Sequence, residues 1–326
     1  MTTLTPDAGT PGTAPDPQAE TRAMLAGTDR RRRTTDRVAT GLVVVAFLVA
    51  LVPLVSVSWT VVSNGVERLT PYFLMHSMRG VFGGMDAGGI YHAIVGTLEI
   101  TAVAAVISVP IGLLTAIYLV EYGGGRALAR AVTFFVDVMT GIPSIVAGLF
   151  AYALFSLIFS DPGIRFGFGG SVALSVLMIP VVVRSCEEML RLVPNELREA
   201  AYALGVPKWL VIVKVVLRTA VAGLGTGIML AVARVIGETA PLLITVGVID
   251  SINFNVFEGR MMSLPVYVYR QYSQGLVPCA PDAADCIATI NYDRAWAAAL
   301  TLILIVMLLN LVGRLITRFF APPTLR

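Results

Sequence analysis

Two ionisable side chains lie four residues apart inside a long apolar run. Arg234 and Glu238 belong to the stretch RVIGETAPLL (residues 234–243), within the apolar run from Thr219 to Ile249. An unpaired charge at that depth in a membrane costs several kcal/mol, and helical residues at i and i+4 share one face. The spacing therefore predicts that Glu238 neutralises Arg234.

Two interpretations of this pair stay open. In one, the pair fixes the packing of membrane helices. In the other, the guanidinium of Arg234 offers its fork of donors to a tetrahedral oxyanion, while Glu238 positions or competes with it so that the anion is released. Pro241 lacks an N–H and leaves the carbonyl of Gly237 without its helical donor, which predicts a helix break beside the pair.

A second carboxylate, Glu99, lies in the apolar run from Tyr91 to Val120, roughly 12 Å from its outer end at about 1.5 Å per residue. It either lines a permeation path or makes a structural hydrogen bond. Pro143 frees the carbonyl of Met139 and predicts a helix break in another run.

The composition places these residues in a membrane. Of 326 residues, 56% are hydrophobic and only 14% are charged, and the mean hydropathy is +0.79. We expect an all-α integral membrane protein with six transmembrane helices. The runs expected to span are Val38 to Val62, Tyr91 to Val120, Val138 to Phe159, Ser171 to Val183, Thr219 to Ile249 and Ala295 to Leu315. The fourth is the shortest and must continue toward Leu190 to cross about 30 Å of hydrocarbon.

The distribution of basic residues predicts the orientation. Most of the 24 Lys and Arg residues lie in the N-terminal segment, around Arg126 and Arg130, between Arg184 and Arg218, and at the C-terminal end. The rule that basic loops face the cytoplasm then puts both termini inside a cell membrane that the chain crosses several times.

The chain divides into three expected regions. Residues 1–37 are rich in Thr, Pro, Gly, Ala and Asp and end in an arginine cluster, so we expect a disordered cytoplasmic tail. Residues 38–62 are expected to be a retained first transmembrane helix rather than a cleaved signal. Residues 91–320 form the transmembrane domain, with a cytoplasmic loop at 187–214 and an extracytoplasmic loop at 250–294.

The cytoplasmic loop contains a short amphipathic helix between the fourth and fifth spans. Leu197, Ala200, Ala201 and Leu204 fall at i, i+3, i+4 and i+7, and Gly205 can end the helix in a left-handed turn. A helix of about 15 Å is marginal alone in water, so the next segment or a partner must hold it. It is either an ordinary surface helix or a docking element.

The spacing of Glu199, Ala200, Ala201 and Gly205, followed by Val215-Val216-Leu217, resembles the EAA loop of permease subunits in binding-protein-dependent ABC importers of type I. In that family the loop docks as a coupling helix on the ATP-binding subunit, so the resemblance assigns these four residues to coupling. Where the family has Pro after the Leu, this chain has Arg218.

Four further stretches resemble the phosphate-importing branch of this family. They are AIYLVEY (116–122), GIPSIVAGL (141–149), RVIGETAPLL and SLPVYVY (263–269), the last two matching PstA-type permeases. The resemblance implies that Arg234 and Glu238 take part in phosphate passage. It also implies a PstB-like ATP-binding subunit dimer, a second, PstC-like permease and an extracytoplasmic PstS-like phosphate-binding protein, in addition to membrane lipid.

Other chemistry is not indicated. Without a P-loop of the form GxxxxGK[ST] the chain is not expected to be an enzyme or to bind a cofactor, so a partner hydrolyses ATP. Cys279 and Cys286 lie in the outer loop, where a disulfide is favoured, and without nearby His they make no metal site. Nothing points to nucleic acid. Two alternatives remain: another oxyanion importer, for sulfate or molybdate, and a stand-alone channel or ion-driven carrier.

Overall fold

The computed structural model describes residues 30–280 and 286–320, so most of the predicted tail lies outside it. The described chain separates into two units, residues 30–59 and residues 60–320 without the undescribed gap. All regular elements of the described residues are helical, apart from one isolated bridge between Met85 and Cys286. The fold is therefore all-α, as predicted.

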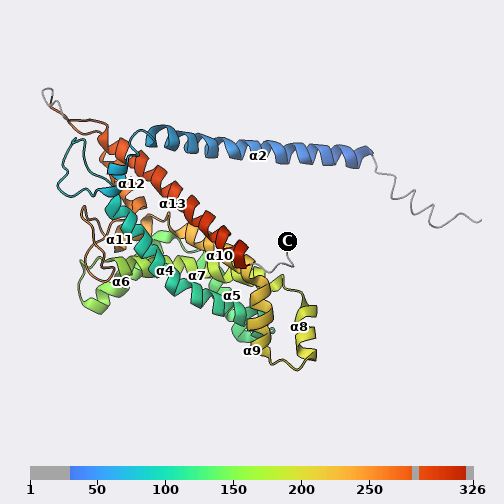
Figure 1. The fold of residues 1–326 in the computed structure, drawn as a ribbon. Coiled ribbons are helices and arrows are strands. Elements are labelled where there is room, and N and C mark those ends of the chain that lie inside the picture. The colour runs from blue at the N-terminus through green and yellow to red at the C-terminus, as the bar shows by residue number, and fades with distance from the viewer. Residues whose placement is uncertain (1–29, 281–285, 321–326) are drawn as a thin grey trace, which may run out of the picture. The chain divides into compact units, whose positions relative to one another are not determined.

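The first unit consists of the greater part of helix α2 (Arg30–Gly65) (Figure 1). The helix begins inside the segment expected to be disordered and extends three residues past Val62. Its apolar side chains are open to the surroundings, with Leu42 67% and Trp59 71% exposed. Such a surface fits hydrocarbon rather than water.

The second unit holds all the other helices. In chain order they are α3 (Pro71–Met75), α4 (Tyr91–Ile117), the π-helical η1 (Tyr118–Tyr122), α5 (Ala127–Thr140), α6 (Ser144–Phe159), α7 (Gly167–Arg191), α8 (Asn195–Ala203), α9 (Lys208–Val211), the π-helical η2 (Ile212–Val216), α10 (Leu217–Val235), α11 (Ala240–Thr245), α12 (Leu264–Gln274) and α13 (Ile290–Phe320).

Five helices of the described chain are long and apolar enough to cross a membrane, and a sixth span results if the bent pair α5 and α6 is counted as one. This agrees with about six predicted spans. The short fourth run does continue helically, since α7 reaches Arg191. The helix break expected at Pro143 is confirmed: the third run bends by 105° between Thr140 and Ser144, and Pro143 directly precedes the first residue of α6.

The fifth predicted span is where expectation and structure disagree. Thr219 to Ile249 is not one helix, because α10 ends at Val235 and the short α11 begins at Ala240. The helical span instead starts earlier, at Lys208, and runs through η2 into α10. The apolar run thus continues past the end of the helix.

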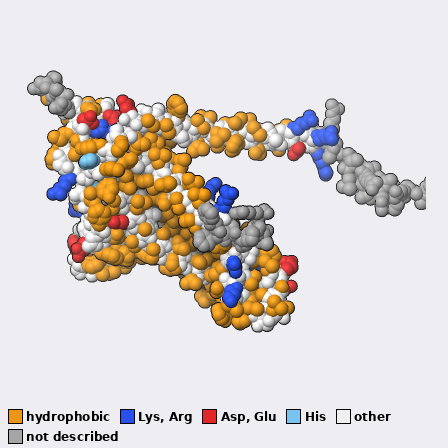
Figure 2. Space-filling view, viewed as in Figure 1, with side chains coloured by type: hydrophobic (Ala, Val, Ile, Leu, Met, Phe, Trp, Pro, Cys, Tyr) orange, Lys and Arg blue, Asp and Glu red, His pale blue; other side chains and the backbone are white. Residues whose placement is uncertain are grey.

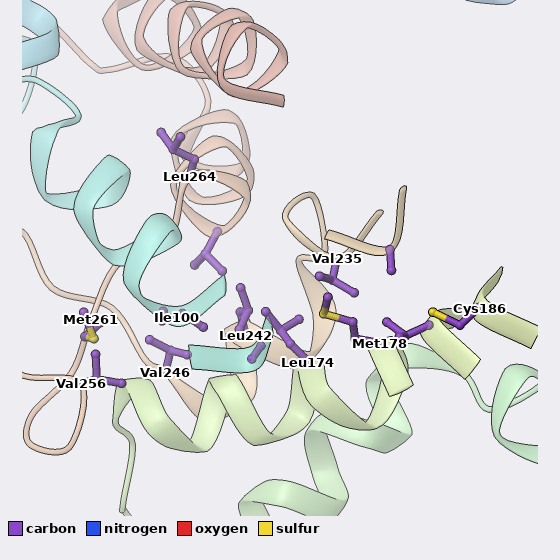
Figure 3. Close-up of a cluster of buried hydrophobic side chains, with 14 of the residues drawn as sticks. Ile100, Leu174, Met178, Cys186, Val235, Leu242, Val246, Val256, Met261 and Leu264 are labelled. Carbon is purple, nitrogen blue, oxygen red and sulfur yellow. The ribbon is translucent and has the colours of Figure 1, made fainter. Parts of the chain in front are cut away.

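Helix α7 forms the centre of the second unit and packs against α4, α5, α6, α10 and α11. Ile100 of α4, Leu174 of α7 and Leu242 of α11 are buried and lie close together in Figure 3. Small residues allow the close approach, since a Cβ on Gly112 of α4 would lie 2.6 Å from a Val182 methyl carbon of α7. Buried polar groups are also paired here: the Ser171 hydroxyl donates to the Ile100 carbonyl at 3.0 Å.

The outer surface of this unit is broadly apolar. Hydrophobic side chains cover much of the face seen in Figure 2, and Phe134, Phe135 and Leu157 are 64%, 64% and 79% exposed. Helices α8 and α12 lie at opposite ends of the bundle (Figure 1). The predicted coupling residues and the predicted outer loop therefore occupy different ends.

Candidate functional site

The break between α10 and α11 positions Arg234 and Glu238. The N–H of Ile236 donates to Val232 O at 3.1 Å, and the N–H of Glu238 donates to Val235 O at 3.1 Å, which closes the last turn of α10. Pro241 lies in the first turn of α11, where its missing N–H costs no helical bond. The break thus precedes Pro241 by several residues.

The packing of α6 against α11 accounts for the direction of the chain after this break. Pro241 is buried against Gly148 of α6, where an added Cβ would lie 2.6 Å from Pro241 Cα and 3.1 Å from Pro241 O. Only glycine allows two backbones to come that close. Gly148 therefore allows α11 to pack closely against α6. This packing determines the path of the backbone from Gly237 to Thr239.

The predicted neutralisation of Arg234 by Glu238 is wrong. Within the described residues neither side chain has an ion pair or a hydrogen bond, with each other or with any neighbour. The i and i+4 rule needs a continuous helix, and the helix ends one residue after Arg234. Arg234 is exposed in this single chain and Glu238 is half-buried. All five guanidinium N–H donors are consequently available to a ligand.

Glu99 is half-buried on α4, and its Oε2 is enclosed without a hydrogen-bond partner among the described groups. The neighbouring turn of α4 holds the start of α12: Thr97 Oγ1 accepts from the N–H of Leu264 at 2.8 Å. The described chain shows no ion pair or hydrogen bond that joins Glu99 to Arg234 or Glu238.

Helix α8 is nine residues long and contains Glu199, Ala200 and Ala201, and the fourth predicted coupling residue, Gly205, lies two residues past its end. Gly205 has φ +76°, its N–H donates to Tyr202 O at 2.9 Å, and the N–H of Val206 donates to Ala201 O at 3.2 Å. This left-handed ending is the one expected of a glycine just past a helix. The helix starts at Asn195, and Pro194 occupies the N-cap position.

The two sides of α8 differ in burial. Ala201 is buried toward the bundle, whereas Glu199, Ala200 and Gly205 are exposed. Leu204 is 83% exposed, more than its place in the amphipathic pattern predicts. The helix therefore presents a small surface of Glu199, Ala200, Leu204 and Gly205 that nothing in the described chain covers.

Ion pairs hold this end of the bundle together, and the residue pattern did not reveal them. Arg198 of α8 pairs with Glu121 of η1 at 2.9 Å. Arg184 of α7 pairs with Asp137 of α5 and, at 2.8 Å, with Glu187. Long-range pairs of this kind have no spacing rule, so the only signal was the presence of charges beside apolar runs.

At the other end, Cys279 and Cys286 form a disulfide with a Cα–Cα distance of 5.7 Å. The free thiol of Cys186 is buried in α7. Among the residues that the structure describes, no group of three or more His, Cys, Asp or Glu side chains could hold a metal ion.

Comparisons with known proteins identify the family of this chain. Residues 108–326 match the family model for the binding-protein-dependent transport system inner membrane component. The phosphate transport system permease protein PstA 1 of Mycobacterium tuberculosis (strain H37Rv) is 50% identical over 294 residues, which cover 89% of this chain and 90% of that protein. PstA of Mycobacterium leprae is 48% identical over 87% of this chain and 88% of its own length.

Solved structures support the fold. A chain of the inward-facing MetNI methionine ABC transporter superposes with TM-score 0.54 at 22% identity, covering 72% of this chain and 95% of that one. A chain of the bacterial alginate ABC transporter, solved with a periplasmic protein bound to alginate pentasaccharide, superposes with TM-score 0.55 at 13% identity, covering 87% and 95%.

Proposed function

This chain belongs to the PstA phosphate permeases of the binding-protein-dependent transport family, and from that premise we propose how its parts carry out phosphate import. It is a multi-pass membrane permease subunit of an ABC importer. Both termini and α8 face the cytoplasm in this proposal, and α12 faces outward, in line with the basic residues near α8. Neither a cofactor nor a catalytic residue is assigned to this chain.

The observation that carries the proposal is the uncovered surface of α8. Glu199, Ala200, Leu204 and Gly205 are exposed on a short helix whose other side is fixed to the bundle. A partner of matching shape is needed to cover such a helix, and a PstB-like ATP-binding subunit dimer is the partner that the family supplies. ATP binding and hydrolysis on that dimer would then move α8.

The second proposed element is the anion path beside Arg234. A guanidinium without an internal partner, at the end of a membrane helix, gives a planar fork of donors that fits the oxygens of phosphate. Exposed apolar side chains such as Phe134 and Phe150 leave a wide surface for lipid or for a second, PstC-like permease. That permease would enclose the path, and a PstS-like protein would deliver phosphate at the end that carries α12.

Glu238 has a different role from the one its spacing suggests. Because the helix ends between the two residues, Glu238 does not neutralise Arg234 permanently. Its half-buried carboxylate lies three residues past the end of α10, where it can hold Arg234 only after a local rearrangement. We assign it to release of the anion, and Glu99 to the wall of the same path closer to α12.

The test uses the complete importer in liposomes with ATP and the loaded binding protein. Arg234→Ala is expected to lower phosphate uptake about tenfold or more, because it removes one charge-assisted hydrogen-bonding contact to the anion. Arg318→Ala is the matched control, because Arg318 is likewise an exposed arginine in the last turn of a membrane helix. Normal uptake by Arg234→Ala would exclude the proposed path.

The nature of the cargo is tested in the same liposomes. The family membership removes the alternative of a stand-alone channel or ion-driven carrier. Sulfate and molybdate are the competitors to test, since the N–H donors of a guanidinium can bind any tetrahedral oxyanion. Excess sulfate or molybdate should leave labelled phosphate uptake unchanged, and strong competition by either would reassign the cargo.

A further inference from the structure

The guanidinium of Arg198 uses each of its five N–H donors. Nε and Nη2 donate to Glu121 Oε1 at 3.1 and 2.9 Å. Nη1 donates to Val193 O at 2.6 Å and to Asn195 Oδ1 at 3.2 Å, and Nη2 also donates to Leu190 O at 3.0 Å. An arginine has no further donors. Arg198 is therefore bonded to α8 itself, to the end of α7 and to the end of α4 through η1.

Burial makes this contact different from the other ion pairs nearby. The side chains of Arg198 and Glu121 are 13% and 5% exposed, whereas Arg191, which pairs with Glu187 at 2.7 Å, is 64% exposed. An exposed pair contributes little, but removal of one partner of an enclosed pair leaves a charge without compensation. Separation of α8 from η1 is thus costly, whereas loss of Arg191 leaves the enclosed Glu187, which is 8% exposed, still paired with Arg184 at 2.8 Å.

A second residue of the loop, Lys208, also contacts η1, from the C-terminal side of the turn at Gly205. Lys208, the first residue of α9, donates through Nζ to the Glu121 carbonyl, and Nζ lies 4.7 Å from the centroid of the Tyr122 ring. Residues before and after the turn at Gly205 therefore converge on Glu121 and Tyr122. These two lie in η1, a π-helical segment of the kind found often at functional sites.

We propose that Arg198 is the positioning residue through which a displacement of α8 reaches α4 and α7, with Glu121 as its counter-charge. The proposal rests on the docking of α8 proposed above. One side of α8, with Glu199, Ala200 and Leu204, meets the ATP-binding subunit. The opposite side is bonded to the ends of two helices that pack closely against each other, so α8 cannot shift alone without breaking enclosed hydrogen bonds.

Transport measurements test whether the contact transmits movement. In the complete importer, Arg198→Gln and Glu121→Gln are expected to lower the phosphate taken up per ATP hydrolysed by about tenfold, because each removes a charged hydrogen-bonding partner. Glu121→Gln keeps the side-chain shape and guards against simple misfolding. Arg198→Lys should also be impaired, since one ammonium cannot replace the five-donor fork. Arg191→Gln should keep the native ratio, because Arg191 itself is 64% exposed and Glu187 keeps its ion pair with Arg184 at 2.8 Å.

Two reporter positions separate transmission from docking. A fluorophore on Tyr202→Cys reports on α8 and one on Leu114→Cys reports on α4, at sites 41% and 66% exposed, while the native Cys186 is buried and does not label. In Arg198→Gln we expect ATP to change the α8 signal but not the α4 signal. If both signals still respond in Arg198→Gln, or if the amount of phosphate taken up per ATP stays native, Arg198 is not the positioning residue. If neither signal responds even with native Arg198, the docking of α8 itself is refuted.

Discussion

A methyl group added at Gly148 is expected to separate α6 from α11. The new Cβ would lie 2.6 Å from Pro241 Cα and 3.1 Å from Pro241 O, both backbone atoms that no side-chain rotation can move. Because carbon atoms in contact prefer about 3.5–4.0 Å, the two helices must separate by about 1 Å. Overpacking of this kind costs about 1–3 kcal/mol.

The matched control lies in the break itself. Gly237 has open space around its potential Cβ and no positive φ, so Gly237→Ala meets nothing. The substitution should leave stability unchanged or raise it by up to about 1 kcal/mol through the unfolded chain. Gly148→Ala and Gly237→Ala thus make the same chemical change, but only the first brings a Cβ against Pro241, and their expected effects on stability differ.

Thermal unfolding of the detergent-purified protein, followed by phosphate uptake of the importer, measures both consequences. Gly148→Ala should lower Tm by several degrees and reduce uptake, because α11 and the segment before it shift relative to Arg234. Gly237→Ala should retain native Tm. If Gly148→Ala unfolds at the native temperature, the close approach at Pro241 does not fix the break, and the reasoning about its cause fails.

Two further predictions concern the ends of the bundle. Cys279→Ser together with Cys286→Ser should lower Tm in non-reducing buffer by an amount corresponding to about 2–3 kcal/mol, the value expected for a loop of this length, and added reductant should abolish the difference from the native chain. Leu204→Asp should prevent co-purification of the ATP-binding subunit with little change in Tm, because Leu204 is 83% exposed, and Leu157→Asp, at 79% exposed on α6, should not. Retention of the subunit by Leu204→Asp would remove α8 from the docking surface.

The features that could be predicted are those determined by residues close together in the sequence. The end of α8 depends on a single glycine, Gly205, which adopts a positive φ. Because this conformation is determined by residues that are neighbours in the sequence, it could be predicted. Long apolar runs likewise indicate where membrane helices exist, and the bend near Pro143 follows from the missing N–H. These features need no knowledge of which helices are neighbours.

The predictions that were wrong or missed depend on contacts between residues that are far apart in the sequence. The end of α10 at Val235 lies inside a continuous apolar run, and what accompanies it is the close packing of Pro241 on Gly148, more than ninety positions earlier in the sequence. Once the helix ends there, the spacing argument for Arg234 and Glu238 loses its basis. The contact between Arg198 and Glu121 joins residues 77 positions apart, and several acidic residues could have been its partner on charge alone.

Helix α7 connects the two places that these arguments single out. Near its start, an added Cβ on Gly170 would lie 2.3 Å from a Val246 methyl carbon and 3.0 Å from a Leu242 methyl carbon, so α7 and α11 are in direct contact there. Near its end, the Leu190 carbonyl accepts from Arg198. From Gly170 to Leu190, at about 1.5 Å per residue, α7 spans about 30 Å between these contacts. If α7 moves together with α8, the displacement therefore reaches α11. The break between α10 and α11, which leaves Arg234 without a partner, then moves as well. No other chain of contacts through the bundle is required.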